Sequence, residues 1–248
     1  DQADKNKNAI RKTKLGDLEF KDVAYRYPGA DLHTLKDINL TIKEGEKVAI
    51  LGRNGSGKST LMKLASGLFK ASDGLVMYDG VDIRQLHSDD LSNSVGIVLQ
   101  DVQLFSGSVK ENITMGRKEI SQEDLINSGK LSGLDEFITK IPGGYDLQLS
   151  DGGKGLSGGQ RQSIALSRSL VHKPTHLIFD EPTSAMDMNA ESSFINQADA
   201  ILKDSTLLIV THRMPLLNLV DRIIIMNEGQ IVEDGSKDEV IKKINPSS

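Results

Sequence analysis

The chain of 248 residues contains no cysteine, which excludes disulfide bonds, thiol catalysis and thiolate metal sites. It also lacks any apolar run approaching the roughly 20 residues that a membrane helix needs, and no signal peptide is recognisable. We therefore expect it to be soluble and cytoplasmic. A starting methionine is missing too, since residue 1 is Asp1. This suggests a piece cut from a longer polypeptide, or a trimmed chain.

A large excess of one charge is missing as well. The 30 basic and 35 acidic residues give a formal net charge of −5. This balance argues against a general nucleic-acid surface, although it leaves room for local patches. The length is enough for one large α/β domain, or for a core with a small subdomain. We find no internal repeat and no low-complexity segment.

The sequence does contain a glycine-rich loop between a short apolar run and a helical segment. Residues 48–60 read VAILGRNGSGKST, which includes the pattern G-x-x-x-x-G-K-[ST]. Glycines allow the backbone to curl around a phosphate, and the following helix adds its positive N-terminal end. Lys58 can then reach the β- and γ-phosphates, and the Ser59 hydroxyl can ligate Mg²⁺. The pattern therefore predicts nucleotide binding.

The hydrophobic periodicity predicts an α/β chain with an inserted helical part. Residues 18–24 and 35–42 alternate as two antiparallel strands of a small β-layer, and residues 100–159 have helical spacing. Within that helical part, Ser121 and Asp124 fit the looser form of the capping box. Further strands are expected at 48–51, 74–78, 95–99, 175–179, 206–210, 222–226 and 230–232, and further helices at 161–170, 189–202 and near 240.

An apolar strand at residues 177–179 ends in two acids, Asp180 and Glu181. The carboxyl ends of parallel strands are where an α/β sheet holds its catalytic groups. An isolated acidic pair is usually an exposed turn, but a phosphate loop in the same sheet favours a functional pair. Asp180 would then support the magnesium ion, and Glu181 would polarise the attacking water, either as general base or by orienting it.

A second glycine-rich helix start, LSGGQ, occupies residues 156–160. Its helix N-terminus makes it a second anion-binding cap. With a phosphate loop upstream and an Asp-Glu strand downstream, LSGGQ resembles the signature of ABC-type ATPases, and the resemblance covers roughly residues 18–243. It implies an α/β fold with a P-loop NTPase (RecA-like) core, an antiparallel β-layer and an inserted α-helical subdomain.

The expected division of the chain follows from this resemblance. Residues 1–15 are polar and without a clear period, as in a flexible linker. The ABC ATPase domain then spans 16–248. Its core and β-layer are expected at about 16–99 and 160–248, and its helical subdomain at about 100–159.

Other residues match the family in order along the chain. Tyr27 matches the aromatic residue that stacks on adenine, Gln100 the glutamine joining sheet and helical subdomain, and His212 the histidine after a later strand. Alone, Tyr27 would more often be a packing residue and His212 a capping or core histidine. Residues 184–187 match the loop after the acids, with Met186 in place of the usual leucine, a swap that conserves volume.

The resemblance implies ATP and Mg²⁺ as cofactors. The nucleotide-binding residues would be Tyr27, Gly52, Arg53, Asn54, Gly55, Ser56, Gly57, Lys58, Ser59, Thr60 and Gln100. A second copy would add, in trans, Ser157, Gly158, Gly159 and Gln160. The catalytic residues would be Glu181, His212 and Lys58, and the magnesium ligands Ser59, Gln100 and, through water, Asp180.

The family also implies a mechanism. Two such domains pack head to tail and sandwich two ATP molecules, each between one phosphate loop and the partner's LSGGQ. A helix N-terminus supplied in trans neutralises the γ-phosphate only while ATP is intact, so hydrolysis lets the dimer open. In transporters this closure is delivered to membrane domains through the helical subdomain.

Several stretches are similar to the exporter branch, namely residues 100–109, 111–113 and 151–155. The run GLSGGQRQ, with residues 211–213 and 219–222, looks most like type I secretion exporters, which move unfolded toxins and adhesins out of Gram-negative bacteria. We expect membrane domains in the same full-length chain, a periplasmic adaptor and an outer-membrane channel. The expected location is the cytoplasmic face of the inner membrane. A peptide or lipid exporter would look similar.

Two other classes remain as alternatives. A soluble ABC ATPase acting on nucleic acid or ribosomes would carry a long coiled coil, zinc modules or two tandem cassettes, and this sequence has none of them. We therefore expect no nucleic-acid partner. A nucleotide-binding regulator that no longer hydrolyses ATP is disfavoured because Glu181 and His212 are both intact.

Overall fold

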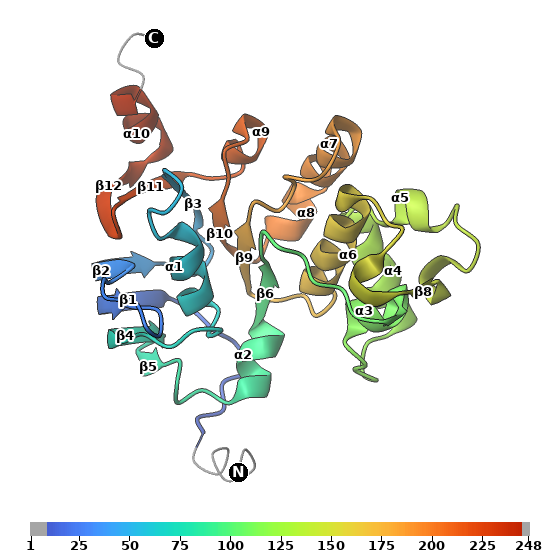
Figure 1. Cartoon of the computed structure of the whole chain (residues 1–248), viewed down its shortest axis with the longest axis horizontal. Coiled ribbons are helices and arrows are strands. Elements are labelled where there is room, and N and C mark those ends of the chain that lie inside the picture. The colour runs from blue at the N-terminus through green and yellow to red at the C-terminus, as the bar shows by residue number, and fades with distance from the viewer. Residues whose placement is uncertain (1–8, 245–248) are drawn as a thin grey trace. The chain divides into compact units, whose positions relative to one another are not determined.

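The computed structural model describes residues 9–244 of the chain (Figure 1). These residues form two compact units. Unit 1 consists of residues 9–95, 175–180 and 205–244, and unit 2 consists of residues 96–174 and 181–204. Each unit therefore contains segments that are far apart in the sequence.

Unit 1 contains an antiparallel sheet with the strand order β2-β1-β4-β5 and a second sheet to which it contributes the order β12-β11-β3-β10-β9. Its strands are β1 (Leu18–Tyr25), β2 (Leu35–Ile42), β3 (Lys47–Gly52), β4 (Asp73–Tyr78), β5 (Val81–Asp82), β9 (His176–Asp180), β10 (Thr206–Val210), β11 (Arg222–Asn227) and β12 (Gln230–Ser236). Its helices are α1 (Lys58–Ala65), α2 (Ser88–Ser94), α9 (Met214–Leu217) and α10 (Lys237–Ile244).

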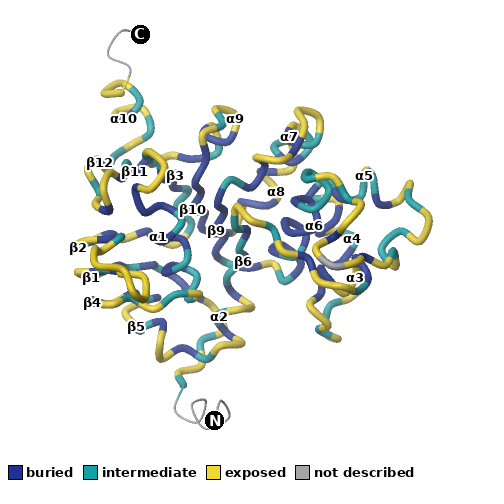
Figure 2. Tube along the Cα trace, viewed as in Figure 1, coloured by how far each residue is buried: buried dark blue, intermediate teal, exposed yellow. Residues whose placement is uncertain are grey.

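The burial of these strands explains their sequence patterns. Every residue of β9 and β10 is buried, as Figure 2 shows along the tube, because each strand lies inside the parallel part of the sheet. Such strands have continuous apolar runs. In β1 and β2 buried and exposed residues largely alternate, as in an antiparallel sheet with one solvated face. The antiparallel β-layer predicted from residues 18–24 and 35–42 is thus confirmed.

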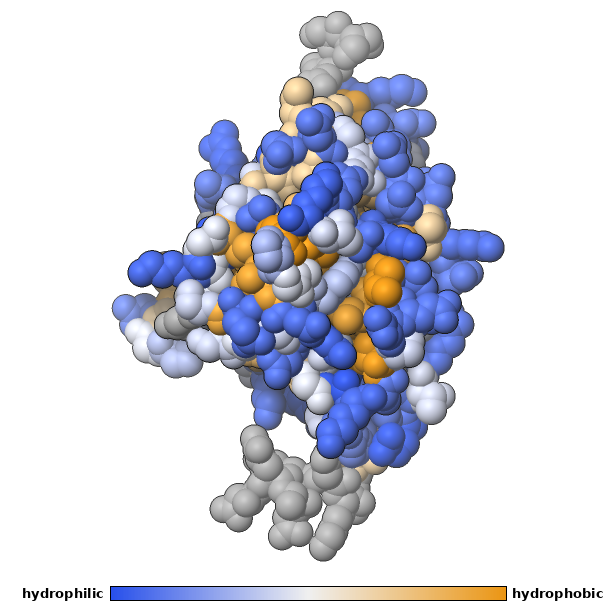
Figure 3. Space-filling view, turned by 90° about the vertical axis from the view of Figure 1, so that its right-hand side faces the viewer, coloured by the Kyte–Doolittle hydropathy of each residue, from blue (hydrophilic) through white to orange (hydrophobic). Residues whose placement is uncertain are grey.

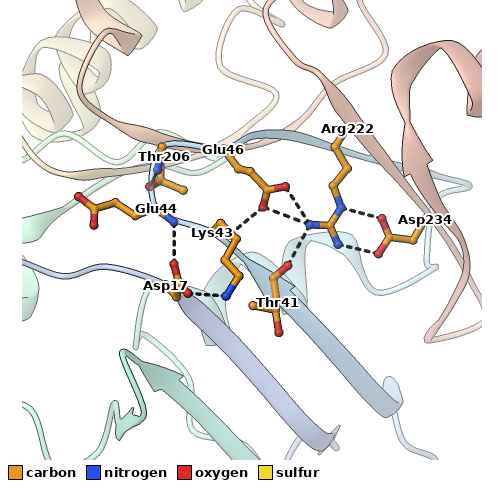
Figure 4. A network of polar contacts seen from close by, with 9 residues as sticks. Asp17, Thr41, Lys43, Glu44, Glu46, Thr206, Arg222 and Asp234 are labelled. Carbon is orange, nitrogen blue, oxygen red and sulfur yellow. Dashed lines mark hydrogen bonds and ion pairs between the residues drawn. The ribbon is translucent and has the colours of Figure 1, made fainter.

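A polar network just before the start of β3 joins the two sheets of unit 1 (Figure 4). Arg222 of β11 donates two hydrogen bonds of 2.7 Å to the Asp234 carboxylate on β12. The same guanidinium donates to the carbonyl oxygen of Thr41 on β2 at 2.9 Å and to the Glu46 carboxylate at 3.1 and 3.2 Å. A bidentate pair of this kind fixes the relative orientation of the guanidinium and the carboxylate, in addition to its electrostatic attraction. The network holds the β-layer beside β3, which carries the phosphate loop.

The segment expected to be a flexible linker is held in place over residues 9–15, and residues 1–8 lie outside the described residues. The Arg11 guanidinium donates two hydrogen bonds, of 2.8 and 2.9 Å, to the buried Asp90 carboxylate. Ile10 pairs with Leu86 in a parallel bridge, and Leu15 is fully buried. The linker interpretation was therefore wrong for residues 9–15, because their polar composition conceals a few specific contacts.

Unit 2 is mainly helical. Its helices are α3 (Val109–Thr114), α4 (Gln122–Leu131), α5 (Asp135–Ile138), α6 (Gly158–Leu170), α7 (Met188–Asn196) and α8 (Ala198–Leu202), with 3-10 turns at Gly144–Asp146 and Asp151–Gly153. It also contains most of β6 (Val95–Val98) and a two-stranded sheet of β7 (Gly107–Ser108) and β8 (Gln148–Leu149). Its core includes Ile113, Leu125, Ile138 and Ile164.

Unit 2 departs from the sequence predictions in three places. The single helix expected at 189–202 is two helices that meet at Gln197. The short strands β7 and β8 were not predicted, because two residues carry no period. At the start of α4 the Ser121 hydroxyl accepts from the Asp124 main-chain N–H at 3.0 Å and donates to the Asp124 carboxylate at 2.6 Å, so the capping box is not closed by the side chain. The predicted limits 100–159 of a helical subdomain stay a prediction.

Figure 3 shows one face of the molecule, on which hydrophilic side chains prevail and apolar ones gather in small groups. The exposed apolar side chains of unit 2 include those of Phe105, Met115 and Met188. Single exposed apolar residues are normal on a folded protein. Within residues 9–244, no helix combines the length and the apolar character needed to cross a membrane.

Candidate nucleotide-binding site

The phosphate loop connects β3 to α1, as the sequence predicts. β3 ends at Gly52, and α1 begins at Lys58 after Gly57, which has a φ of +101°. Gly52 has a φ of +150°, and a Cβ at this position would lie 2.3 Å from the main-chain oxygen of Met226 on β11. No side chain fits there without moving the backbone. The loop can therefore approach the neighbouring strand only because residue 52 is glycine.

Lys58 points back into this loop. Its ammonium group donates hydrogen bonds to the carbonyl oxygens of Gly52 at 2.7 Å and of Arg53 at 3.0 Å, and the residue is only 7% exposed. The nearby Ser56 hydroxyl is buried and has no hydrogen-bond partner. Buried polar atoms are nearly always satisfied, so an orphan marks a place where a polar group is completed by a ligand or water. A buried cation and an unsatisfied hydroxyl fit a bound phosphate.

Tyr27 lies at the same end of unit 1 and belongs to a cluster of three aromatic rings. The centroid of its ring is 5.1 Å from that of Tyr25 and 5.8 Å from that of Phe69, both edge to face. Its hydroxyl shares a hydrogen bond of 3.2 Å with the hydroxyl of Thr60, in the first turn of α1. The ring is 37% exposed. Tyr27 therefore presents a held, accessible ring beside the phosphate loop.

The strand register brings two further predicted residues to the edge of the sheet at which β3 ends and the phosphate loop begins. β3, β10 and β9 are parallel neighbours, with Ile50 opposite Val210 and Val210 opposite Asp180. Asp180 is the last residue of β9 and is 3% exposed. His212 follows the end of β10 and is exposed. Because carboxyl ends of parallel strands meet at one edge, the phosphate loop, Asp180 and His212 lie at the same edge.

The described residues contain no group of three or more His, Asp or Glu side chains that could hold a metal ion by themselves. Magnesium is usually held by one or two protein oxygens together with substrate phosphates and water. Ser59, half-buried at the start of α1, and the buried Asp180 are oxygen donors of that kind. Their chemistry fits Mg²⁺ that arrives with a nucleotide.

Two predicted residues, Glu181 and Gln100, belong to unit 2. Glu181 follows Asp180 in the chain and has a φ of +51°, a left-handed backbone that non-glycine residues seldom adopt. Such strained residues cluster at active sites. Gln100 follows β6 and is exposed. Their positions at the phosphate loop remain predictions.

The LSGGQ motif forms the start of α6, as the sequence predicts. The Ser157 hydroxyl accepts a hydrogen bond from the Gln160 main-chain N–H at 3.1 Å, and the Gln160 side chain accepts from the Ser157 N–H at 2.9 Å. This is a closed capping box. The helix N-terminus beside it lines a cavity of about 500 Å³, together with Phe137, Lys140 and Asp187. An open, capped helix start of this kind suits an anion.

The glycines of this motif have a packing role within unit 2. A Cβ on Gly159 would lie 3.1 Å from the main-chain oxygen of Ala185, and one on Gly158 would lie 3.0 Å from the Ala185 side chain. The motif therefore needs small residues where the loop of residues 184–187 crosses it. This contact was missed from the sequence, since nothing in the motif indicates which segment packs on it.

A phosphate loop and an acidic strand end at one edge of a parallel sheet define a P-loop nucleoside triphosphatase. Comparison with known families narrows this class. The model of the ABC transporter family matches residues 35–184, and the chain belongs to that family. ATP-binding domains of ABC transporters are ATPases, so this chain is an ATP-binding ATPase domain.

The chain is similar to several named exporters. It is 40% identical over 230 residues to the toxin RTX-I translocation ATP-binding protein of Actinobacillus pleuropneumoniae, covering 93% of this chain and 32% of the relative. It is 41% identical over 228 residues to the exotoxin translocation ATP-binding protein PaxB of Pasteurella aerogenes, covering 92% and 32%. A putative multidrug export ATP-binding/permease protein of Staphylococcus aureus is 39% identical over 230 residues, with 93% and 40% covered.

The fold is shared with a solved exporter. The structure of a bacterial Atm1-family ABC exporter with ATP bound matches with a TM-score of 0.88 and 30% sequence identity, covering 96% of this chain and 42% of that one. The RecA-like core with helices and an antiparallel layer, predicted from the sequence, is confirmed. This chain spans 32% to 40% of the length of these curated relatives.

Proposed function

We propose that this chain is the ATP-hydrolysing domain of an ABC exporter in which two copies close around two ATP molecules. Each ATP would lie between the phosphate loop of one copy and the LSGGQ motif of the other. The observation that carries this proposal is the pair of anion-suited sites in one chain: the loop at Lys58 in unit 1 and the capped helix start at Ser157 in unit 2. An enzyme complete within one chain needs only the first.

The residues that would hold the nucleotide in cis come from unit 1, except Gln100, which belongs to unit 2. Tyr27 would stack on the adenine, and Lys58 with the N–H groups of the loop would bind the phosphates. Ser59, Gln100 and, through water, Asp180 would hold Mg²⁺, which supplies charge neutralisation on the phosphates. Lys58 already points into the loop, so binding would exchange its carbonyl partners for phosphate oxygens.

Glu181 and His212 would act on the reacting groups. Glu181 would take up or orient the proton of the attacking water, and His212 would contact the γ-phosphate. Ser157, Gly158 and Gly159 of the partner copy would approach the same phosphate with the N-terminus of α6, while Gln160 keeps that helix start closed. Loss of the γ-phosphate would remove this contact and let the copies separate.

We propose further that the exporter secretes a protein or peptide by a type I system. Two toxin translocation proteins at 40% and 41% identity support this assignment. The membrane domains would belong to the same full-length chain. The ATPase would lie on the cytoplasmic face of the inner membrane, with a periplasmic adaptor and an outer-membrane channel completing the path. No nucleic acid would take part.

A second candidate is export of small molecules. The putative multidrug export proteins at 39% identity support it nearly as well. The two candidates separate in the full-length exporter reconstituted in proteoliposomes. An unfolded polypeptide should stimulate ATP hydrolysis in a type I secretion exporter, whereas lipophilic drugs should do so in a multidrug exporter.

The ATPase proposal is tested at Glu181. Glu181→Gln should keep ATP affinity but lower turnover at least about a hundredfold, the low end expected for loss of a positioned base. It should also trap an ATP-bound dimer, visible by size-exclusion chromatography. Glu123→Gln, an exposed change on α4, is the matched control and should leave both unchanged. Near-normal turnover of Glu181→Gln would remove this residue from the role.

A further inference from the structure

Gln162 lies near the start of α6. Both polar atoms of its side chain form hydrogen bonds with one loop of the same unit. The residue is 1% exposed. Its amide nitrogen donates to the main-chain oxygen of Glu181 at 2.8 Å and to the Ser184 hydroxyl at 3.3 Å. Its amide oxygen accepts from the main-chain N–H of Ala185 at 2.9 Å. Because the Glu181 oxygen needs a donor and the Ala185 N–H needs an acceptor, the side-chain amide of Gln162 can take only one orientation.

The loop that Gln162 holds begins with a residue in a strained conformation. The φ of Glu181 is +51°, and such a backbone persists only where its surroundings fix it. The turn after it is closed by the Ser184 N–H, which donates to the Glu181 carbonyl at 3.2 Å. The Gln162 amide adds a second, shorter hydrogen bond to the same carbonyl oxygen. The direction of the Glu181 side chain follows from this backbone.

A second helix holds the middle of the loop. The hydroxyl of Thr183, which is fully buried, donates to the Glu191 carboxylate of α7 at 2.5 Å. Gln162 lies on α6, the helix that begins at Ser157, and its amide reaches the backbone of Glu181.

We infer that Gln162 is a positioning residue for Glu181, and that it links the LSGGQ helix to water activation within one chain. The inference rests on the proposed function, in which Ser157 serves the ATP of the partner copy and Glu181 serves the ATP of its own. At about 3.6 residues per turn, Ser157 and Gln162 lie less than two turns apart on α6. When Ser157 engages the partner's nucleotide, α6 is fixed, and Gln162 fixes the Glu181 backbone with it.

The test replaces the amide without changing the size of the side chain. Gln162→Met has a similar volume but cannot form the three hydrogen bonds. It should lower kcat for ATP at least tenfold and leave KM within twofold, because the phosphate loop is untouched. Gln162→Glu keeps an acceptor for the Ala185 N–H and loses the donor to Glu181, so it should lower kcat as well. Gln122→Met, an exposed change on α4, should have no effect.

A second measurement distinguishes the positioning of Glu181 from a merely structural role of Gln162. In a Glu181→Gln background, adding Gln162→Met should lower the single-turnover rate of hydrolysis less than twofold, since the group being positioned is already gone. A further tenfold loss there would overturn the inference, because it would show an effect that does not pass through Glu181.

The remaining outcomes are also decisive. If Gln162→Met does not fold, Gln162→Glu carries the test, and a kcat within twofold of the wild type in whichever variant folds overturns the inference. Failure of the proposed function looks different: Glu181→Gln itself would then retain turnover. A dead Glu181→Gln with a fully active Gln162→Met leaves the proposed function standing and removes only the role of Gln162.

Discussion

The hydroxyl of Tyr27 lies 3.2 Å from the hydroxyl of Thr60, so the ring expected to stack on adenine is tied to the helix that follows the phosphate loop. Tyr25 and Phe69 support the same ring edge to face. The two ends of the nucleotide would thus be bound by groups in direct contact. The sequence identified Tyr27 by its family match alone and gave no indication of the link to Thr60.

Replacing Tyr27 separates the ring from its hydroxyl. Tyr27→Ala should weaken ATP binding by about 1–3 kcal/mol, the range for stacking of a base on an aromatic ring. Tyr27→Phe keeps the ring and loses only the contact with Thr60, so it should weaken ATP binding clearly less than Tyr27→Ala does. Isothermal titration of both variants with ATP measures this. Equal losses in the two variants would show that the hydroxyl, and not the ring, binds the nucleotide.

Replacing Gly52 and Gly29 by alanine, one at a time, tests how tightly the phosphate loop is packed. Both have positive φ, but a Cβ on Gly52 would meet the main chain of Met226 at 2.3 Å, whereas a Cβ on Gly29 would meet nothing within 4 Å. Gly29→Ala should lower the free energy of unfolding by about 1–2 kcal/mol through its left-handed backbone alone. Gly52→Ala should cost at least about 1 kcal/mol more. Urea denaturation without nucleotide compares them, and equal costs would contradict the close packing.

His176 gives the chain a pH dependence of stability. Its side chain is 2% exposed, and Nε2 lies 2.8 Å from the carbonyl oxygen of Gly16. Burial holds the pKa of His176 below its ordinary value of 6.5, although the hydrogen bond to Gly16 opposes this. The unfolded chain therefore binds the proton first as the pH falls, so the free energy of unfolding should decrease below about pH 6.5.

The slope of that decrease can reach about 1.4 kcal/mol per pH unit for one group. Urea denaturation at several pH values between 8 and 5.5 measures it, above the range in which carboxylates titrate. His176→Gln keeps a donor for the Gly16 carbonyl and cannot titrate, so its stability should depend less on pH in this window. The same pH dependence in both proteins would exclude His176 as its source.

Much of the fold could be predicted because its strands have distinct patterns. The continuous apolar runs of β9 and β10 and the alternation in β1 and β2 are direct consequences of burial on two faces or one. The contacts of Arg11 and Leu15 could not be predicted, since a single ion pair and a single buried leucine leave no period in the sequence. The break between the two helices at Gln197 could not be predicted for a similar reason, since the hydrophobic spacing continues across it.

The candidate site was predictable where a motif has a local geometry. Lys58 lies at the start of α1 because the glycines of the phosphate loop precede it. Ser157 lies at the start of α6 because it is itself the capping residue of that helix. The bonds from Gln162 to Glu181 and from Tyr27 to Thr60 join residues far apart in the chain, and only the folded backbone brings them together. The roles of Glu181, Gln100 and His212 stay predictions that mutation must test.

A mixing experiment probes the composite site. Ser157→Arg combined with Lys58→Ala places both lesions in one of the two sites of a mixed dimer and leaves the other intact. If one site can fire alone, the mixture should recover part of the activity that each variant lacks by itself. Gln148→Arg, an exposed change on β8, is the control for the added charge and should keep full activity.

The most direct measurement of whether LSGGQ acts in trans is the steady-state ATPase rate of purified Ser157→Arg, with ATP binding measured on the same sample. Binding should remain close to that of the wild type, because Lys58 and the backbone of the phosphate loop are unchanged in unit 1. Turnover should be abolished, since a bulky cation at the start of α6 blocks its approach to the partner's nucleotide. Strong ATPase activity of this variant would contradict the composite site.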